Sequence, residues 1–213
     1  MVGRIITIAQ QKGGSGKTTL AAHLAVAWAI GQDQEVAVLD VDPQGSLGEW
    51  FEMREDVLGE TETGLVFRTA SGWGARREAR SMARDFPVVI VDTPPKSDTE
   101  AKPAIDAADL VLIPVQPTPI DYWATKSTVT MATNERTEAL LILNRVLSRA
   151  SLTEEMKNAI SESGYPLADA SLGNRTGFAA SMGKGRSVQE TMPSSKAADE
   201  IAALYRELKN HLE

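Results

Sequence analysis

The chain has 213 residues, of which 42% are hydrophobic and 24% charged, the balance of an ordinary globular protein that can bury a substantial core. It contains no cysteine, which excludes a disulfide framework and iron–sulfur clusters held by cysteine. Its formal net charge of −7 argues weakly against nucleic-acid binding, although a total can conceal a local basic patch.

A glycine-rich segment between a predicted strand and a predicted helix is the most informative part of the sequence. Residues 4–9 are apolar and β-branched, which predicts a buried strand. Residues 20–30 have helical periodicity, with Gly31 at the expected position of a C-terminal cap. The segment between them reads QKGGSGKTT from residue 11 to residue 19. Its glycines let successive N–H groups converge on one anion at the start of a helix, so we expect a phosphate-binding loop.

The side chains of this loop have separate expected roles. Lys17 supplies a charge for the β- and γ-phosphates, and the Thr18 hydroxyl is placed to ligate Mg²⁺. The loop departs from the general pattern G-x-x-x-x-G-K-[ST], because Gln11 stands at the position of its first glycine and an additional lysine, Lys12, comes next. The alternative without a binding function is a glycine-rich turn with two solvated lysines. The residues that we expect around the nucleotide phosphates are Gly13, Gly14, Ser15, Gly16, Lys17, Thr18 and Thr19.

This departure resembles the deviant Walker A motif of the ParA/MinD family of P-loop ATPases. The resemblance is closest to small ParA-type partition and positioning ATPases and covers nearly the whole chain from Arg4 onward. It implies one P-loop ATPase domain over residues 1–213, of the α/β class, with a mostly parallel, doubly wound sheet and helices on both faces. It also implies that the chain binds ATP with Mg²⁺. In that family the lysine matched by Lys12 reaches across a dimer interface to the partner's nucleotide.

Two acidic residues end the next predicted strand. Residues 35–41 are mostly apolar, and Asp40 and Asp42 lie in a D-x-D-P-Q run. The run resembles the switch I segment of ParA proteins. By that match Asp42 would position or activate the attacking water, and Asp40 would support the magnesium shell. The alternative is that both acids cap a helix over residues 45–51.

The following segment contains an edge strand and a basic helix. Residues 64–69 predict a short edge strand, and residues 74–85 predict a helix. This helix carries Arg76, Arg80 and Arg84 on one face with Arg77 nearby. We expect a solvated face, with contact to nucleic acid as the alternative.

An apolar strand over residues 87–92 ends in Asp92 and has the Walker B pattern. A carboxylate at the tip of such a strand can hold Mg²⁺ directly or through water. The D-T-P-P run that starts at Asp92 also resembles the family's switch II segment.

Two further apolar strands are predicted over residues 109–115 and 139–145. The P-x-P-x-D run that ends at Asp121 resembles part of the dimer interface of small ParA proteins, and it also fits a proline-set turn at a helix start. The resemblance implies that Asn144 contacts adenine and that the loop at Pro193 lies beside the nucleotide. Guanine-specific motifs are absent, which favours ATP over GTP.

The C-terminal part carries a candidate DNA-binding stretch. Residues 170–188 contain Arg175, Lys184 and Arg186 but no acidic residue. By resemblance to ParA relatives these residues would bind DNA without sequence preference, and a solvated loop is the alternative. The last predicted helix has apolar residues at helical spacing between Ile201 and Leu212, which we expect to pack on the sheet rather than serve as a membrane anchor.

The combined hypothesis is a ParA-like ATPase, with Lys12, Lys17 and Asp42 as catalytic residues. It would form a homodimer on binding ATP, bind nonspecific DNA and hydrolyse ATP to segregate or position a cargo. A ParB-like protein or cargo adaptor would stimulate hydrolysis. No membrane span or signal peptide is recognised, so we expect a cytoplasmic, nucleoid-associated protein. The alternatives are a MinD-like membrane-associated ATPase and a metabolic P-loop ligase.

Overall fold

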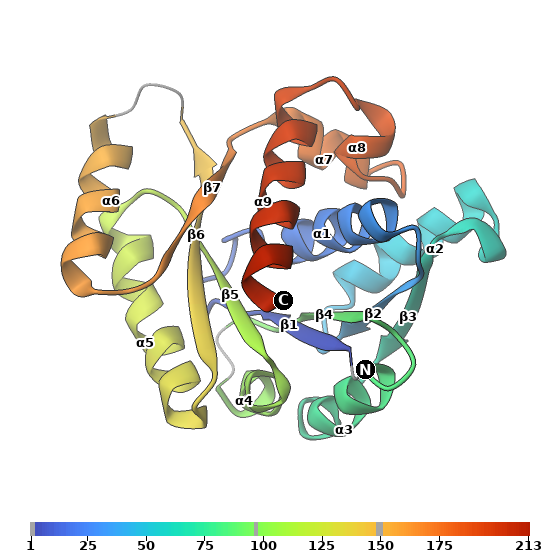
Figure 1. Ribbon diagram of the computed structural model, residues 1–213, viewed down its shortest axis with the longest axis horizontal. Helices are drawn as coiled ribbons and strands as arrows, with labels where there is room; N and C mark the ends of the chain where they lie inside the picture. The colour runs from blue at the N-terminus through green and yellow to red at the C-terminus, as the bar shows by residue number, and fades with distance from the viewer. Residues whose placement is uncertain (1–2, 96–97, 148–150) are drawn as a thin grey trace.

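The structure is a computed structural model that describes residues 3–95, 98–147 and 151–213. Seven strands within these ranges form one parallel sheet in the order β3-β2-β4-β1-β5-β6-β7 (Figure 1). The strands are β1 Arg4–Ile8, β2 Val36–Asp40, β3 Leu65–Thr69, β4 Val88–Asp92, β5 Leu110–Val115, β6 Glu138–Val146 and β7 Leu167–Gly173. The α/β class and the parallel sheet expected from the sequence are confirmed.

Helices cover both faces of this sheet, as Figure 1 shows. Helices α1, α2, α7, α8 and α9 lie on one face, and α3, α4, α5 and α6 lie on the other. The helices are α1 Lys17–Gln32, α2 Ser46–Leu58, α3 Gly72–Met82, α4 Asp98–Ala107, α5 Pro119–Glu135, α6 Ser151–Ser163, α7 Thr176–Met182, α8 Val188–Thr191 and α9 Lys196–Leu212, with a 3₁₀ turn at Glu60–Glu62. None of the described helices is long and apolar enough to cross a membrane.

The central strands are buried on both sides, which explains their nearly continuous apolar sequences. In β1, Ile6 and Ile8 pack in the cluster beneath α1 and α9, while Ile5 packs in the cluster beneath α3 and α4. Parallel pairing places Asp92 beside Ile8 and beside Asp40. The carboxyl ends of β1, β2 and β4 therefore meet at one edge of the sheet, where ligands of open α/β sheets bind.

The structure corrects the expected end of the first helix. Helix α1 continues through Gly31 to Gln32, and the left-handed residue after it is Asp33, with φ of 51°. A Cβ on Gly31 would stand 2.4 Å from the ring of Tyr205 in α9. Gly31 therefore allows two helices to approach closely and does not cap the first. Helix α2 also extends to Leu58, beyond the expected range of 45–51.

The expectations for the two sheet edges had different outcomes. The edge strand expected at residues 64–69 is confirmed as β3. Strand β7 forms the other edge and was not expected, because its residues LADASLG lack a continuous apolar pattern and its register to β6 is irregular. Helix α9 packs on the sheet as expected, with Ile201, Leu204 and Leu208 fully buried.

Candidate functional site

The loop between β1 and α1 leaves its inner side open. Gly14 and Gly16 have left-handed φ angles of 76° and 91°, a conformation that only glycine adopts freely. A Cβ placed on Gly13 or Gly14 would meet no atom within 4 Å. The buried hydroxyl of Ser15 has no hydrogen-bond partner among the described residues. An open loop at a helix N-terminus with an unsatisfied polar group fits a bound phosphate.

Lys17 begins α1 and brings a buried cation to this loop. Its side chain is 6% exposed, and its Nζ donates a hydrogen bond to the carbonyl of Gln10 at 3.1 Å. Burial lowers the pKa of Lys17, whereas the charges of Asp92 and Asp42 act in the opposite direction. A cation held against the loop backbone, with carboxylates near but not bonded to it, is placed to receive an anionic ligand.

Thr18 and Asp92 form the second part of the site. The Thr18 hydroxyl donates to the Asp92 carboxylate at 2.6 Å. Burial raises the pKa of Asp92 to about 7, with the Thr18 hydrogen bond and the Lys17 charge opposing and the Asp40 charge adding to that effect. Burial also raises the pKa of Asp40. Mg²⁺ would remove this cost of burying carboxylates, and hydroxyl and carboxylate oxygens are the ligands it prefers. The residues present therefore fit Mg²⁺.

No group of three or more acidic or histidine side chains within the described ranges could hold a metal ion by itself. Mg²⁺ does not require such a group, because the ion is usually held by one or two carboxylates together with water and substrate phosphates.

Asp40 and Asp42 also organise the entry to α2. The Asp40 carboxylate accepts from the N–H groups of Asp42 at 2.9 Å and Gly48 at 3.3 Å. The Asp42 carboxylate accepts from the N–H of Gln44 at 3.0 Å. The capping alternative therefore describes a contact of Asp40 with the first turn of α2, whereas Asp42 caps only the turn before the helix, whose N-cap is Gly45. It does not compete with a role at the site, because Asp40 lies beside Asp92 in the sheet and the charge of Asp42 acts on Lys17.

The side chain of Lys12 forms an ion pair within its own chain. Its Nζ contacts the carboxylate of Asp121 at 2.5 Å, and that carboxylate also accepts a hydrogen bond from the Thr118 hydroxyl. Asp121 is 3% exposed in the first turn of α5, next to Ile120 and Trp123, which are 64% and 69% exposed. The second lysine of the loop is therefore tied to a helix that also presents apolar side chains to solvent.

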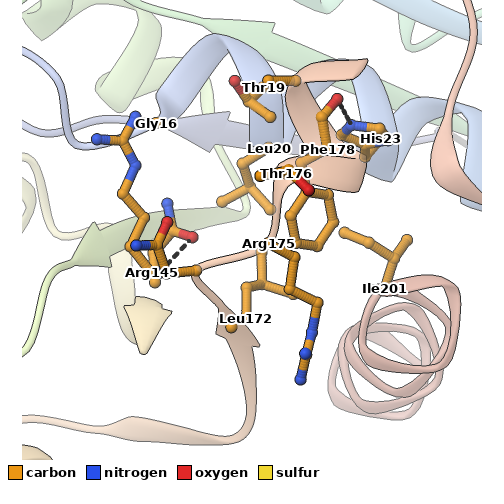
Figure 2. A pocket seen from close by; sticks show the side chains of 14 residues that line it. Gly16, Thr19, Leu20, His23, Arg145, Leu172, Arg175, Thr176, Phe178 and Ile201 are labelled. Carbon is orange, nitrogen blue, oxygen red and sulfur yellow. Dashed lines mark hydrogen bonds between the residues drawn. The ribbon is translucent and has the colours of Figure 1, made fainter. Parts of the chain in front are cut away.

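A pocket of about 270 Å³ adjoins the loop. In Figure 2, Leu172, Phe178 and Ile201 lie together, with Arg145 on the other side. Asn144 at the end of β6 also lines it and donates to the Ser15 carbonyl at 2.7 Å. The walls of this pocket are partly apolar, and the pocket lies beside a loop that fits phosphates. It is therefore suited to bind a nucleoside.

The walls from β7 and α7 were missed by the sequence analysis, since β7 itself was not recognised. A second feature at the pocket is the left-handed conformation of Arg145, with φ of 55°. Non-glycine residues adopt it rarely, and such strain is concentrated at functional sites. A sequence contains no signal for it.

The remaining candidate residues differ in position, since Arg175 borders the pocket while Pro193, Lys184 and Arg186 do not. Pro193 is exposed in the turn before α9 and does not line the pocket. Arg175 does line it (Figure 2), but its Nε donates to both carboxylate oxygens of Glu200, at 2.9 and 3.0 Å. Lys184 and Arg186 follow the opposite end of α7. The acid-free stretch of the sequence therefore has an acidic neighbour in space, and its three cations are not one continuous cluster.

A buried ion pair joins α2 to the C-terminal part and was also missed. The Arg54 guanidinium donates to the two carboxylate oxygens of Glu190 at 3.0 and 2.8 Å and to the Thr63 carbonyl at 2.9 Å. Burial alone would raise the pKa of Glu190, but hydrogen bonds from Arg54 and Ser187 outweigh it and lower that pKa. The helix after Asp40 and Asp42 is thus anchored to α8.

Comparisons with known proteins agree with this geometry. The family model described as the CobQ/CobB/MinD/ParA nucleotide binding domain matches residues 6–188. The maintenance of carboxysome distribution protein A of Halothiobacillus neapolitanus is 29% identical over 95% of each chain. The protein of the same name from Gloeobacter kilaueensis is 34% identical over 78% of this chain and 75% of its own. The chromosome partitioning protein ParA of Myxococcus xanthus is 30% identical over 58% of this chain and 54% of its own.

Solved structures share the fold. The cell division ATPase MinD of Pyrococcus furiosus superposes with a TM-score of 0.81 at 20% identity, covering 98% of this chain and 99% of its own. A variant of Cyanothece McdA in complex with ATP superposes with a TM-score of 0.77 at 18% identity, covering 99% and 96%. Cobyrinic acid a,c-diamide synthase from Mycobacterium smegmatis, with an ATP analogue and magnesium, has a TM-score of 0.80 at 20% identity, covering 100% and 96%.

Proposed function

Since the chain belongs to the CobQ/CobB/MinD/ParA nucleotide-binding family, we propose that it is a ParA-type ATPase that dimerises on ATP, binds DNA nonspecifically and positions a cargo. The observation that carries this proposal is the placement of Lys17, Thr18 and Asp92 around an open glycine loop that Lys12 precedes. The same elements would bind the phosphates of ATP and hold Mg²⁺.

Each side chain then has a defined task. The loop N–H groups and Lys17 bind the phosphates, and Thr18, Asp92 and Asp40 hold Mg²⁺, which neutralises phosphate charge when bound. Asp42 orients the water that attacks the γ-phosphate. Asn144 and the neighbouring pocket accept the adenine and ribose.

Dimerisation would use the surface around α5. Lys12 exchanges its contact with Asp121 for the phosphates of a nucleotide in a second copy of the chain. Exposed Ile120 and Trp123 lie beside that contact and would be covered in the dimer. Burying two such side chains offsets part of the free energy lost when the Lys12–Asp121 pair breaks.

The relatives favour a protein assembly as the cargo. The carboxysome distribution proteins match 95% and 78% of this chain at 29% and 34% identity, whereas the ParA proteins of Rhizobium radiobacter and Myxococcus xanthus match 83% at 29% and 58% at 30%. We therefore propose that the stimulating partner is an adaptor on a large protein assembly, rather than a protein bound to a plasmid or chromosome site.

Light scattering with nucleotide analogues tests this function most directly. We expect a dimer with Mg²⁺ and a non-hydrolysable ATP analogue and a monomer with ADP, together with fluorescence anisotropy that shows binding to random-sequence duplex DNA only in the first state. Flotation with anionic vesicles is the parallel arm. Vesicle binding without DNA binding would instead support a MinD-like protein. Tight ATP binding without dimerisation would support a ligase.

A further inference from the structure

Helix α3 presents a row of uncovered side chains on its outer face. Trp73 is 87% exposed, more than any other large hydrophobic residue in the described part of the chain. Arg77, Arg80 and Arg84 are also exposed, at positions 4, 7 and 11 residues after it. At 3.6 residues per turn Trp73, Arg77 and Arg80 share one side of the helix, over a length of about 11 Å. Arg84 lies in the turn that follows the end of α3 at Met82, so the helix is shorter than the expected range of 74–85 at this end. We call these four residues the α3 stripe.

The charges of the stripe are not neutralised by neighbours. Arg77, Arg80 and Arg84 form no ion pair within the described ranges, whereas the adjacent Arg76 bonds Asp106 at 2.7 Å. Glu78, the acidic residue within the helix, is bonded to Arg68 at 2.7 Å. Three cations without an ion pair among the described residues thus lie along α3 and the turn after it, where exposed Asp85 follows Arg84, on a protein whose net charge is −7.

Two glycines flank Trp73 in the first turn of α3. A Cβ on Gly72 would stand 2.5 Å from the Cα of Glu100, so this glycine lets the first turn of α3 pack directly on α4. At Gly74 the nearest atom to an added Cβ is the Ser71 Oγ at 3.5 Å, an ordinary contact. Gly74 therefore lowers helix propensity without a packing reason, and it adds no side chain that could shield Trp73.

From this geometry we infer that the α3 stripe docks an acidic segment of a partner protein, whose carboxylates pair with the arginines and whose apolar residue covers Trp73. Arginine binds carboxylates through two parallel hydrogen bonds, and tryptophan and arginine dominate the energetic centres of protein interfaces. Duplex DNA would use the arginines but offers no unstacked base for the indole.

The position of the stripe connects it to the candidate site. Helix α3 follows β3, whose last residue pairs with Asp40, and the N–H of Ala70 donates to the Asp40 carbonyl at 3.0 Å. The Trp73 end of the stripe therefore lies next to the carboxyl end of β2. Helix α3 lies on the same face of the sheet as α4, away from α1 and α9 (Figure 1). The docking itself does not depend on the proposed ATPase activity.

The test uses a fluorescein-labelled peptide of 16 residues built from Glu-Glu-Leu-Glu repeats. Anisotropy at low salt should show saturable binding to the full chain, with or without nucleotide. The Arg77→Glu/Arg80→Glu variant should weaken it at least tenfold, and Trp73→Ala should weaken it severalfold at unchanged charge. The matched control is Arg136→Glu/Arg206→Glu, which makes the same charge change at exposed arginines of other elements and should bind nearly as well as the parent.

Circular dichroism and ATP affinity of the α3 variants should match the parent, which separates a failure of docking from a failure of the proposed function. Unchanged peptide binding by Trp73→Ala, or an equal loss in the control, would overturn the inference. So would an α3-dependent affinity for duplex DNA without any for the peptide.

Discussion

Lys17 is the residue on which nucleotide binding depends most. It is buried at the loop, and the only hydrogen-bond acceptor recorded for its Nζ among the described residues is the Gln10 carbonyl. We expect Lys17→Ala to lower ATP affinity about 100-fold, because hydrogen bonds to charged groups contribute roughly 1.5–3 kcal/mol. Calorimetric titration with Mg·ATP measures it. Near-normal affinity would show that the loop is not the phosphate site.

Alanine substitutions of Asp42 and Asp92 should have different effects on ATP affinity and hydrolysis, although both residues are carboxylates near Lys17. Asp42→Ala removes the residue that we propose to orient water and also a negative charge near a polyanion. ATP affinity should hold or rise, while single-turnover hydrolysis falls by about 10²–10⁴-fold. Asp92→Ala removes the partner of Thr18 and should weaken Mg·ATP binding as well. If Asp42→Ala hydrolyses at the parent rate, Asp42 acts only as the turn cap seen before α2.

His23 should make stability depend on pH. It lies buried in α1, where its Nδ1 accepts from the Val188 N–H at 3.2 Å and its Nε2 faces the Phe178 carbonyl at 3.3 Å. Burial lowers its pKa from 6.5 to about 4, and the carboxylate of Glu190 is the charge that opposes this effect. The unfolded chain therefore binds the proton more readily, and the contribution of His23 is fully present above pH 6.5 and lost as the pH falls toward 4.

This predicts a loss of about 2 kcal/mol in the free energy of unfolding between pH 7 and pH 5 from His23 alone. Urea denaturation of the parent and of His23→Gln at both pH values separates the contribution of His23 from that of the carboxylates, which titrate in both proteins. The parent should lose more stability than the variant over that range. Equal losses would mean that His23 titrates normally in the folded chain.

At the scale of elements, the contact between the loop and α5 is a candidate switch. Lys12 is bound to Asp121 in the single chain and would be required by the partner in the dimer. Lys12→Ala should keep measurable nucleotide binding but lose ATP-dependent dimerisation and hydrolysis. Asp121→Asn should instead weaken the hold on Lys12 and lower the ATP concentration needed for dimerisation.

Light scattering during an ATP-analogue titration distinguishes these variants. Lys126→Ala is the matched control, because it removes an exposed lysine from α5, the helix that carries Asp121. If Lys12→Ala dimerises and turns over ATP like the control, Lys12 is only a surface charge.

At the scale of the whole molecule, the question is which basic side chains can contact DNA. Arg175 is paired with Glu200 and lines the pocket that we propose for the nucleoside, so Arg175→Glu is expected to disturb nucleotide binding. Lys184 and Arg186 have no ion pair within the described ranges. Lys184→Glu/Arg186→Glu should therefore lose DNA binding but retain ATP-driven dimerisation.

The salt dependence gives a quantitative check. Each phosphate contact should contribute about −0.9 to the slope of log affinity against log salt concentration. Anisotropy with duplex DNA at several salt concentrations should therefore show a shallower slope for the single variant Lys184→Glu than for the parent. An unchanged slope and affinity in the double variant would exclude these two residues as DNA contacts.

The sequence by itself determined those elements whose functional residues are neighbours along the chain. The loop from Gly13 to Thr18 and the strand ends at Asp40 and Asp92 were recognised because residue type and spacing specify a strand, a tight turn and an acid at one place. The same holds for the central strands, which are apolar because both of their faces are buried. The contacts of Asp121 and Arg175 were beyond this kind of inference.

Tertiary structure decided the partners of the charged groups and the shape of the pocket. Lys12 meets Asp121 across 109 residues of sequence, Arg54 meets Glu190 across 136, and Arg175 meets Glu200 across 25. The pocket takes its walls from α1, β6, β7, α7 and α9. Periodicity in a sequence records whether a side chain is buried, but not which segment buries it. That depends on how the strands order themselves in the sheet, and the order is set by packing of the whole chain.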